Sequence, residues 1–75
     1  IDKTTEHATR KAFPFFGEDE NLDSLIEREL LLTLGSGKVF TGYLEGFDES
    51  HIFLRGRRSQ RIVIRRRAIA AWEVL

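Results

Sequence analysis

The sequence predicts a mainly β domain in which a short N-terminal α-helix precedes five strands of a strongly bent antiparallel sheet. Short apolar segments recur through residues 30–75, and polar or glycine-containing turns separate them. Helical spacing of apolar residues is confined to one brief stretch before residue 30. Gly42 and Gly46 fall inside one strand-like segment, where glycine favours a sharp bend or the close approach of another backbone. Together these observations favour a small, partly open barrel.

Residues 1–20 are expected to form an extended arm, because they show neither helical nor strand periodicity and contain Pro14, Gly17 and an acidic run. The arm carries three closely spaced phenylalanines: Phe13, Phe15 and Phe16. Two hypotheses account for these aromatic residues. They dock on their own or a neighbouring domain, or they form a peptide-like motif that binds a partner.

A short helix is expected to open the folded domain, which covers residues 21–75. Asn21 or Asp23 can cap this helix. The apolar positions that follow have helical spacing: Leu22, Leu25 and Ile26.

Five strands are expected after the helix, at residues 30–34, 38–47, 51–55, 62–64 and 68–75. The fifth is almost entirely apolar, and an uncovered apolar strand at a sheet edge is an aggregation hazard. Pairing with the fourth strand of an identical subunit would cover this edge, and such head-to-tail contacts can close into a ring. Alternatively, the arm or the short helix covers the edge within one chain.

Length and composition exclude several classes of function. A chain of 75 residues holds one domain with a small core. It contains no cysteine and only two histidines, His7 and His51, so we expect no disulfide, metal site or cofactor. We also expect no enzyme, because the serines lack a triad-like spacing and no phosphate-cradling motif occurs. No apolar run approaches the ~20 residues of a membrane span, so we expect a cytoplasmic protein without a membrane partner.

The formal net charge of zero conceals two oppositely charged halves. Residues 1–50 hold five basic and eleven acidic side chains, a net charge of −6. Residues 51–75 hold seven arginines and one acid, a net charge of +6. All seven arginines lie within residues 55–67, and such a dense basic block favours an anionic partner.

Two segments resemble the signatures of the Sm-like superfamily, which includes the bacterial RNA chaperone Hfq and the Sm and LSm proteins of archaea and eukaryotes. The first segment reads Leu30-x-Leu32-x-Leu34-x-x-Gly37-x-x-x-x-Gly42-x-Leu44-x-x-Phe47-Asp48. The second reads Ile62-Val63-Ile64-Arg65 followed by Arg66-Arg67-Ala68-Ile69. The resemblance covers roughly residues 21–75 and implies an Sm-like barrel. It also implies a homo-oligomeric ring, a hexamer or heptamer, that binds single-stranded RNA near its central pore, with a candidate role as an RNA chaperone.

The resemblance assigns the RNA-contacting positions only in part. The place that supplies a base-stacking side chain in the family is Ser50, and an Asn that contacts uracil in Sm proteins falls at Ile52. His51 is a candidate for contacting a base, although strand alternation sends it to the opposite face from Ile52. The alternative is a surface histidine.

The basic positions match the family more closely. Arg65 falls on the arginine of the archaeal signature, and Arg66 and Arg67 fall on the Lys and His of Hfq. The arginine guanidinium stays charged, can donate two parallel hydrogen bonds to phosphate oxygens and stacks on bases. We therefore expect these residues to bind RNA. The remaining arginines form a candidate phosphate-contacting rim: Arg55, Arg57, Arg58 and Arg61. Alternatively, they keep a solvated hairpin soluble or pair with three acids: Glu27, Glu29 and Glu45.

Two functions are consistent with these residues. The first is an RNA-binding ring that holds single-stranded, U-containing RNA. The second is an Sm-fold assembly module without base-specific recognition, which binds protein or the nucleic-acid backbone through charge. Base preference and salt dependence distinguish the two, because backbone binding follows ionic strength and ignores base identity.

Overall fold

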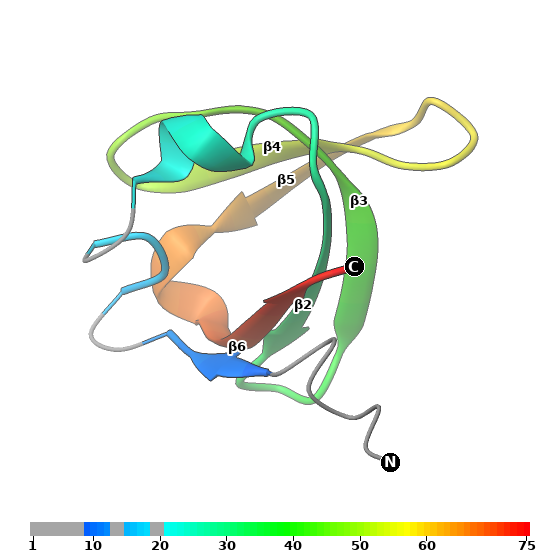
Figure 1. The fold of residues 1–75 in the computed structure, drawn as a ribbon. Helices are drawn as coiled ribbons and strands as arrows, with labels where there is room; N and C mark the ends of the chain where they lie inside the picture. Colours follow the sequence, from blue (N-terminus) through cyan, green and yellow to red (C-terminus); the bar gives the residue numbers. More distant parts are fainter. Residues whose placement is uncertain (1–8, 13–14, 19–20) are drawn as a thin grey trace, which may run out of the picture.

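The computed structural model describes residues 9–12, 15–18 and 21–75. Its strands form one antiparallel sheet that curls around the core (Figure 1). In chain order they are β1 Arg10–Lys11, β2 Glu29–Leu34, β3 Val39–Phe47, β4 His51–Arg55, β5 Arg61–Arg65 and β6 Ile69–Val74. The spatial order is β1-β6-β2-β3-β4-β5, so the sheet formed by the described residues is open, with β1 and β5 at its edges. The predicted mainly β, antiparallel class is confirmed.

The prediction of five strands is wrong, because the sheet of the described residues has six. The additional strand, β1, lies within the arm and pairs with β6 in the register Arg10↔Trp72 and Lys11↔Ala71. The ladder continues with the Ala12 N–H, which donates to the carbonyl of Ala70 at 3.3 Å. A strand of two exposed cationic residues has no apolar alternation, so the hydrophobic pattern could not predict it.

The predicted N-terminal α-helix is also wrong, because a single 3-10 turn, η2 (Leu22–Leu25), takes its place. The side chain of Asn21 caps this turn as expected. The turn ends early because the residues just before β2 already form backbone hydrogen bonds with β3. The Glu27 N–H donates to the Leu44 carbonyl at 2.8 Å, and the Leu44 N–H donates to the Arg28 carbonyl at 3.1 Å. Glu27 also has a positive φ of 72°, which a helix cannot continue through.

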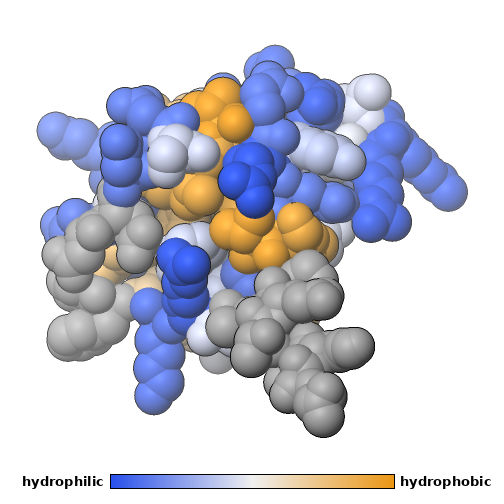
Figure 2. Space-filling view, in the orientation of Figure 1, coloured by the Kyte–Doolittle hydropathy of each residue, from blue (hydrophilic) through white to orange (hydrophobic). Residues whose placement is uncertain are grey.

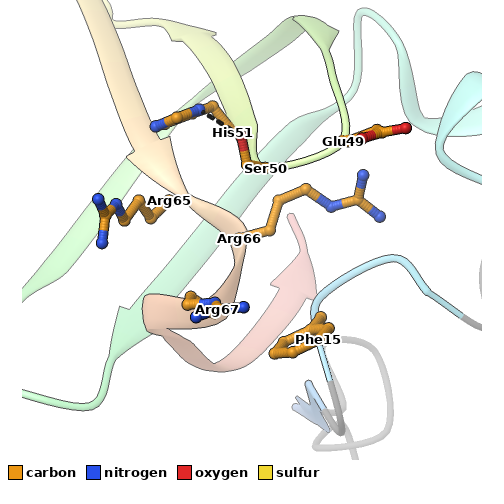
Figure 3. A pocket seen from close by; sticks show the side chains of 7 residues that line it. All are labelled: Phe15, Glu49, Ser50, His51, Arg65, Arg66 and Arg67. Carbon is orange, nitrogen blue, oxygen red and sulfur yellow. Dashed lines mark hydrogen bonds between the residues drawn. The ribbon is translucent and has the colours of Figure 1, made fainter.

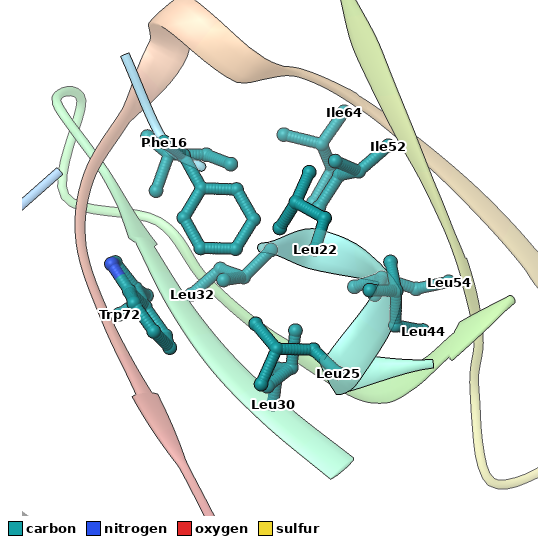
Figure 4. Packing of buried hydrophobic residues seen from close by; sticks show 11 residues of the cluster. Phe16, Leu22, Leu25, Leu30, Leu32, Leu44, Ile52, Leu54, Ile64 and Trp72 are labelled. Carbon is teal, nitrogen blue, oxygen red and sulfur yellow. The ribbon is translucent and has the colours of Figure 1, made fainter. Parts of the chain in front are cut away.

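The concave side of the sheet encloses an apolar core that the arm and η2 complete (Figure 4). Eleven side chains form it: Phe16, Leu22, Leu25, Leu30, Leu32, Leu44, Ile52, Leu54, Ile64, Ile69 and Trp72. Phe16 from the arm packs edge-on against Trp72, with ring centroids 5.0 Å apart and an interplanar angle of 76°. One of the arm phenylalanines therefore docks on its own domain, whereas Phe13 lies outside the described residues.

The sheet bends where its pairing is irregular. The β3–β4 register shifts between Leu44 and Gly46, and the β2–β6 register shifts between Thr33 and Leu34. Such bulges increase the twist and bend a strand. At Gly42 the neighbouring strand comes so close that an added Cβ would lie 3.0 Å from the carbonyl oxygen of Arg55.

A second 3-10 turn, η3 (Arg66–Ala68), connects β5 to β6. It is tied to the β2–β3 hairpin by the Gly35 N–H, which donates to the Ala68 carbonyl at 2.9 Å. On the face shown in Figure 2, hydrophilic side chains predominate and apolar ones emerge between them. The described part of the chain contains no helix with the length and apolarity needed to cross a membrane.

Candidate functional site

A cavity of about 270 Å³ opens where the β3–β4 turn, the β5–η3 junction and the arm meet (Figure 3). Seven residues line it: Phe15, Glu49, Ser50, His51, Arg65, Arg66 and Arg67. The structure thus brings together all five residues that the sequence placed at an RNA-contacting site. The site is built from three segments that are distant in sequence.

The β4–β5 ladder explains why the predicted residues converge. It pairs His51 with Arg65, the first residue of β4 with the last of β5. One position further on, the Arg66 N–H donates to the Ser50 carbonyl at 2.9 Å. Backbone pairing between neighbouring segments therefore places Ser50 and His51 directly beside Arg65 and Arg66, at the junction of β5 and η3.

Asp48 holds the turn that presents Ser50 and His51. Its Oδ1 accepts hydrogen bonds from the backbone N–H of Ser50 at 2.9 Å and of His51 at 2.7 Å. These two bonds, that from Ser50 first, hold the pKa of the Asp48 carboxyl below its usual value because they favour its charged form. The Ser50 hydroxyl in turn lies 2.9 Å from His51 Nδ1, so the two cavity side chains also contact each other.

Arg66 joins the arm to the β3–β4 turn. Its Nε donates to the carbonyl of Phe16 at 3.0 Å, and its Nη1 donates to the carbonyl of Asp48 at 2.8 Å. Figure 3 shows its side chain extending to the opposite side of the chain from that of Arg65. Arg66 thus lines the cavity, but two of its hydrogen-bond donors are already bonded to backbone carbonyls of the protein.

Arg65 and Arg67 are both exposed, but their surroundings differ. The Arg67 guanidinium carbon lies 5.2 Å from the centroid of the Phe15 ring, a cation–π contact. Among the described residues, the Arg65 side chain has neither a hydrogen bond nor an ion pair. Arg65 is therefore the cavity arginine with the most freedom to meet an anionic ligand.

Ile52, the position of the uracil-contacting Asn in the resembled family, is fully buried in the core. It lies on the opposite face of β4 from His51, as strand alternation predicts. An amide readout of uracil from this position is therefore excluded. Besides its charged side chains, the cavity offers the Ser50 hydroxyl and the His51 imidazole as polar groups.

The candidate phosphate rim lies apart from this cavity, and two of its arginines pair with acids. Arg55 Nη1 lies 3.1 Å from Glu45, and its Nη2 lies 4.0 Å from Glu27. Arg57 Nη2 lies 3.2 Å from Glu29. Arg58 and Arg61 are exposed, and Arg61 borders a second hollow of about 300 Å³ beside an acid and an aromatic ring: Glu45 and Phe53. The acids named as alternative partners are thus the ones that contact Arg55 and Arg57.

Sequence reasoning missed Phe15 and Glu49 as cavity residues. Glu49 adjoins the predicted Ser50, so its position follows from the turn. Phe15 lies fifty residues before the arginines, and only the docking of its neighbour Phe16 brings it there. The available signal was the Phe15-Phe16 pair itself, because one ring that docks in the core holds its neighbour close to the same surface.

Comparisons of the chain with models of known protein families, with curated proteins and with solved structures found no match.

Proposed function

We propose that this chain is an Sm-like RNA-binding protein that assembles as a homo-oligomeric ring of six or seven subunits. In this proposal β2 to β6 are the five strands of an Sm-like barrel, and single-stranded, U-containing RNA binds near the central pore. A role as an RNA chaperone follows from the same assignment. The bent antiparallel sheet and the sequence signatures at residues 30–48 and 62–69 support the fold part.

The observation that carries the RNA-binding part is the composition of the cavity. Three consecutive arginines, a histidine, a serine and an aromatic ring line one space of about 270 Å³. A single acid, Glu49, is among its lining residues. Guanidinium groups bind phosphate oxygens and stack on bases, and an aromatic ring offers a base a stacking surface. This combination suits a nucleotide of a single strand better than a neutral metabolite.

The edges of the sheet support assembly but also set a condition for it. On β5, an edge strand of the described sheet, Val63 is 54 % exposed, as expected of a residue that a neighbour could cover. On β6 the corresponding edge is paired with β1 through two residues. A ring built by β5–β6 pairing therefore requires β1 to leave that edge. Light scattering at micromolar protein concentration tests the ring, and a monomer mass at every concentration would exclude it.

The test of RNA binding uses Arg65→Ala, because Arg65 is the cavity arginine whose side chain makes no hydrogen bond, ion pair or cation–π contact with another described residue. Fluorescence anisotropy of labelled oligouridine is expected to show a loss of affinity of about tenfold or more, equivalent to about 1.4 kcal/mol. The matched control is Arg28→Ala, which removes the same charge from an exposed position outside the cavity. Equal losses in the two variants, or equal affinity of wild type for all homopolymers at every salt concentration, would contradict the proposal.

A specific observation favours the second candidate, binding through charge alone. Ile52 is buried, and the Ser50 hydroxyl is engaged with His51, so the cavity keeps its cations while lacking the family's base-reading groups. Backbone binding predicts no base preference and a steep salt response, with a slope that falls by roughly 0.7 for each lost phosphate contact to a single strand. A base preference that persists at high salt would exclude it.

A further inference from the structure

The arm places one aromatic ring in the core and the preceding one at the cavity. Phe16 is completely buried against Trp72, and its carbonyl accepts a hydrogen bond from Arg66. Phe15 and Phe16 are themselves part of a turn, in which the Glu18 N–H donates to the Phe15 carbonyl at 3.0 Å. The residues that follow Phe15 thus hold its backbone in place, while Phe15 itself remains 39 % exposed.

The exposed ring of Phe15 lies beside cations rather than in an apolar patch. Arg67 stacks over it at 5.2 Å, and the cavity wall continues through Arg66 toward His51 and Arg65 (Figure 3). Its neighbour Phe16 already provides the hydrophobic anchor of this segment. The packing of the arm on the core therefore does not explain why the Phe15 ring lies at the cavity.

We propose that Phe15 is the base-stacking residue of the cavity, and that the arm therefore forms part of the nucleic-acid site. This inference rests on the proposed RNA binding and assigns the aromatic platform that Ser50 does not provide. A base stacks on the Phe15 ring, while Arg67 and Arg65 face its phosphates. The cavity volume of about 270 Å³ lies at the small end of ligand pockets, which fits a single nucleotide.

The experiment compares two ligands of equal length: hexauridylate and the corresponding abasic ribose-phosphate strand. Phe15→Ala and Phe15→Leu are expected to weaken binding of hexauridylate roughly fivefold to a hundredfold, the range of base–aromatic stacking. Binding of the abasic strand is expected to stay unchanged, because it presents phosphates without bases. Phe15→Trp is expected to retain affinity, and hexauridylate is expected to quench the fluorescence of the new indole.

Val39→Ala is the matched control, because Val39 is a 55 % exposed apolar residue outside the cavity. The variant is expected to bind both strands like wild type. The fluorescence of the buried Trp72, the only tryptophan of the chain, reports whether the Ala and Leu variants keep the arm docked.

The possible failures are distinct. If wild type binds neither strand, the proposed RNA binding is wrong and the role of Phe15 falls with it. If wild type binds hexauridylate and Phe15→Ala binds it equally well, the stacking role is wrong while RNA binding stands. Retention of full affinity by Phe15→Leu would likewise overturn stacking, since leucine keeps apolar bulk but has no ring.

Discussion

Asp48 shows how one side chain shapes the cavity without pointing into it. Its Oδ1 accepts two backbone hydrogen bonds, which orient the turn that carries Ser50 and His51. Because both bonds favour the carboxylate, the pKa of Asp48 is lower in the folded protein than its ordinary value of 3.8. The stability that this carboxylate contributes is therefore present above that ordinary value and is lost as the pH falls through the folded pKa.

We expect the free energy of unfolding to decline in acid, and Asp48→Asn to make that decline smaller. The asparagine keeps an acceptor oxygen but has no proton to gain between about pH 5 and pH 2. Urea unfolding followed by Trp72 fluorescence across this range measures the effect. Asp23→Asn, at an exposed position outside the cavity, serves as the control and is expected to behave like wild type. Identical pH profiles for wild type and Asp48→Asn would contradict the assignment.

At the residue scale, the sequence located most of the cavity, because its polar residues are neighbours in the chain or partners in one hairpin. Ser50 and His51 are adjacent, and the β4–β5 register brings Arg65 opposite His51. Phe15 could not be placed in this way, since its position depends on the hydrogen bond from Arg66 to the arm backbone. The backbone contacts of Arg66 could not be predicted either, because any residue can supply a carbonyl.

The two glycines of β3 are both unusual within a strand, yet the structure gives them different roles. A Cβ at Gly42 would lie 3.0 Å from the Arg55 oxygen and 3.1 Å from Leu54 Cβ. A Cβ at Gly46 would meet only the edge of the Phe53 ring, at an ordinary 3.8 Å. Gly42 thus permits the close approach of β4, whereas Gly46 lies beside the register shift.

We therefore expect Gly42→Ala to lower the free energy of unfolding by about 1 to 3 kcal/mol, because β3 and β4 must separate to admit the methyl group. Gly46→Ala is expected to change it by less than about 1 kcal/mol, since the methyl fits and the unfolded chain loses entropy. Urea denaturation of the two variants provides the comparison. Similar losses of unfolding free energy in both variants would contradict this distinction, because the bend at Gly46 would then restrict β3 as much as the close contact at Gly42.

At the element scale, the hydrophobic pattern was informative where it was long and failed where the elements were short. The apolar alternation of residues such as Ile52 and Leu54 predicted which side of β4 faces the core. The spacing of Leu22, Leu25 and Ile26 predicted a helix, but backbone pairing at Glu27 and Arg28 left space for one 3-10 turn. Tertiary contacts decided both the helix and the two-residue β1.

On the scale of the whole molecule, the arm occupies an edge that assembly would need. β1 covers the middle of β6 with a two-residue ladder, reinforced by Arg10, whose guanidinium carbon lies 5.0 Å from the Trp72 ring. A two-residue strand is expected to compete poorly for β6 against a longer strand from a second subunit. The arm and a second subunit would thus compete for β6, and the apparent affinity of assembly would scale with the fraction of molecules whose edge is free.

Deleting residues 1–12 removes β1 but keeps Phe15 and Phe16, and is expected to promote assembly. The concentration at which half of the protein is assembled is expected to fall severalfold, because no arm displacement precedes association. Light scattering over a dilution series measures this concentration. Deletion of residues 1–8 is the control, since it leaves β1 in place. Equal assembly of the two truncated proteins would show that β1 does not restrict the edge.

Ion pairs between the acidic residues 1–50 and the basic residues 51–75 involve only some of the arginines of the described chain. Ion pairs bring acids of the first half to Arg55 and Arg57, whereas Arg65 has no such partner among the described residues. Among the described residues, the arginines of the basic block without an acidic partner are therefore Arg58 and Arg61 near the β4–β5 turn and the three consecutive arginines at the cavity. Repetition of the cavity arginines around a ring would multiply their charge, which favours a polyanion over an isolated phosphate.

The position of β6 also determines when the molecule can be completed during its synthesis. β6 follows every other strand in the chain, yet it lies between β1 and β2 in the sheet. The hairpins from β2 to β5 close short loops, whereas the Arg10↔Trp72 pairing spans most of the sequence. While a ribosome still holds β6, the nascent chain can present its arginine turn but has no strand on which to dock the arm. We therefore expect Phe15 to reach the cavity last, so that the proposed binding site is complete only after β6 has emerged.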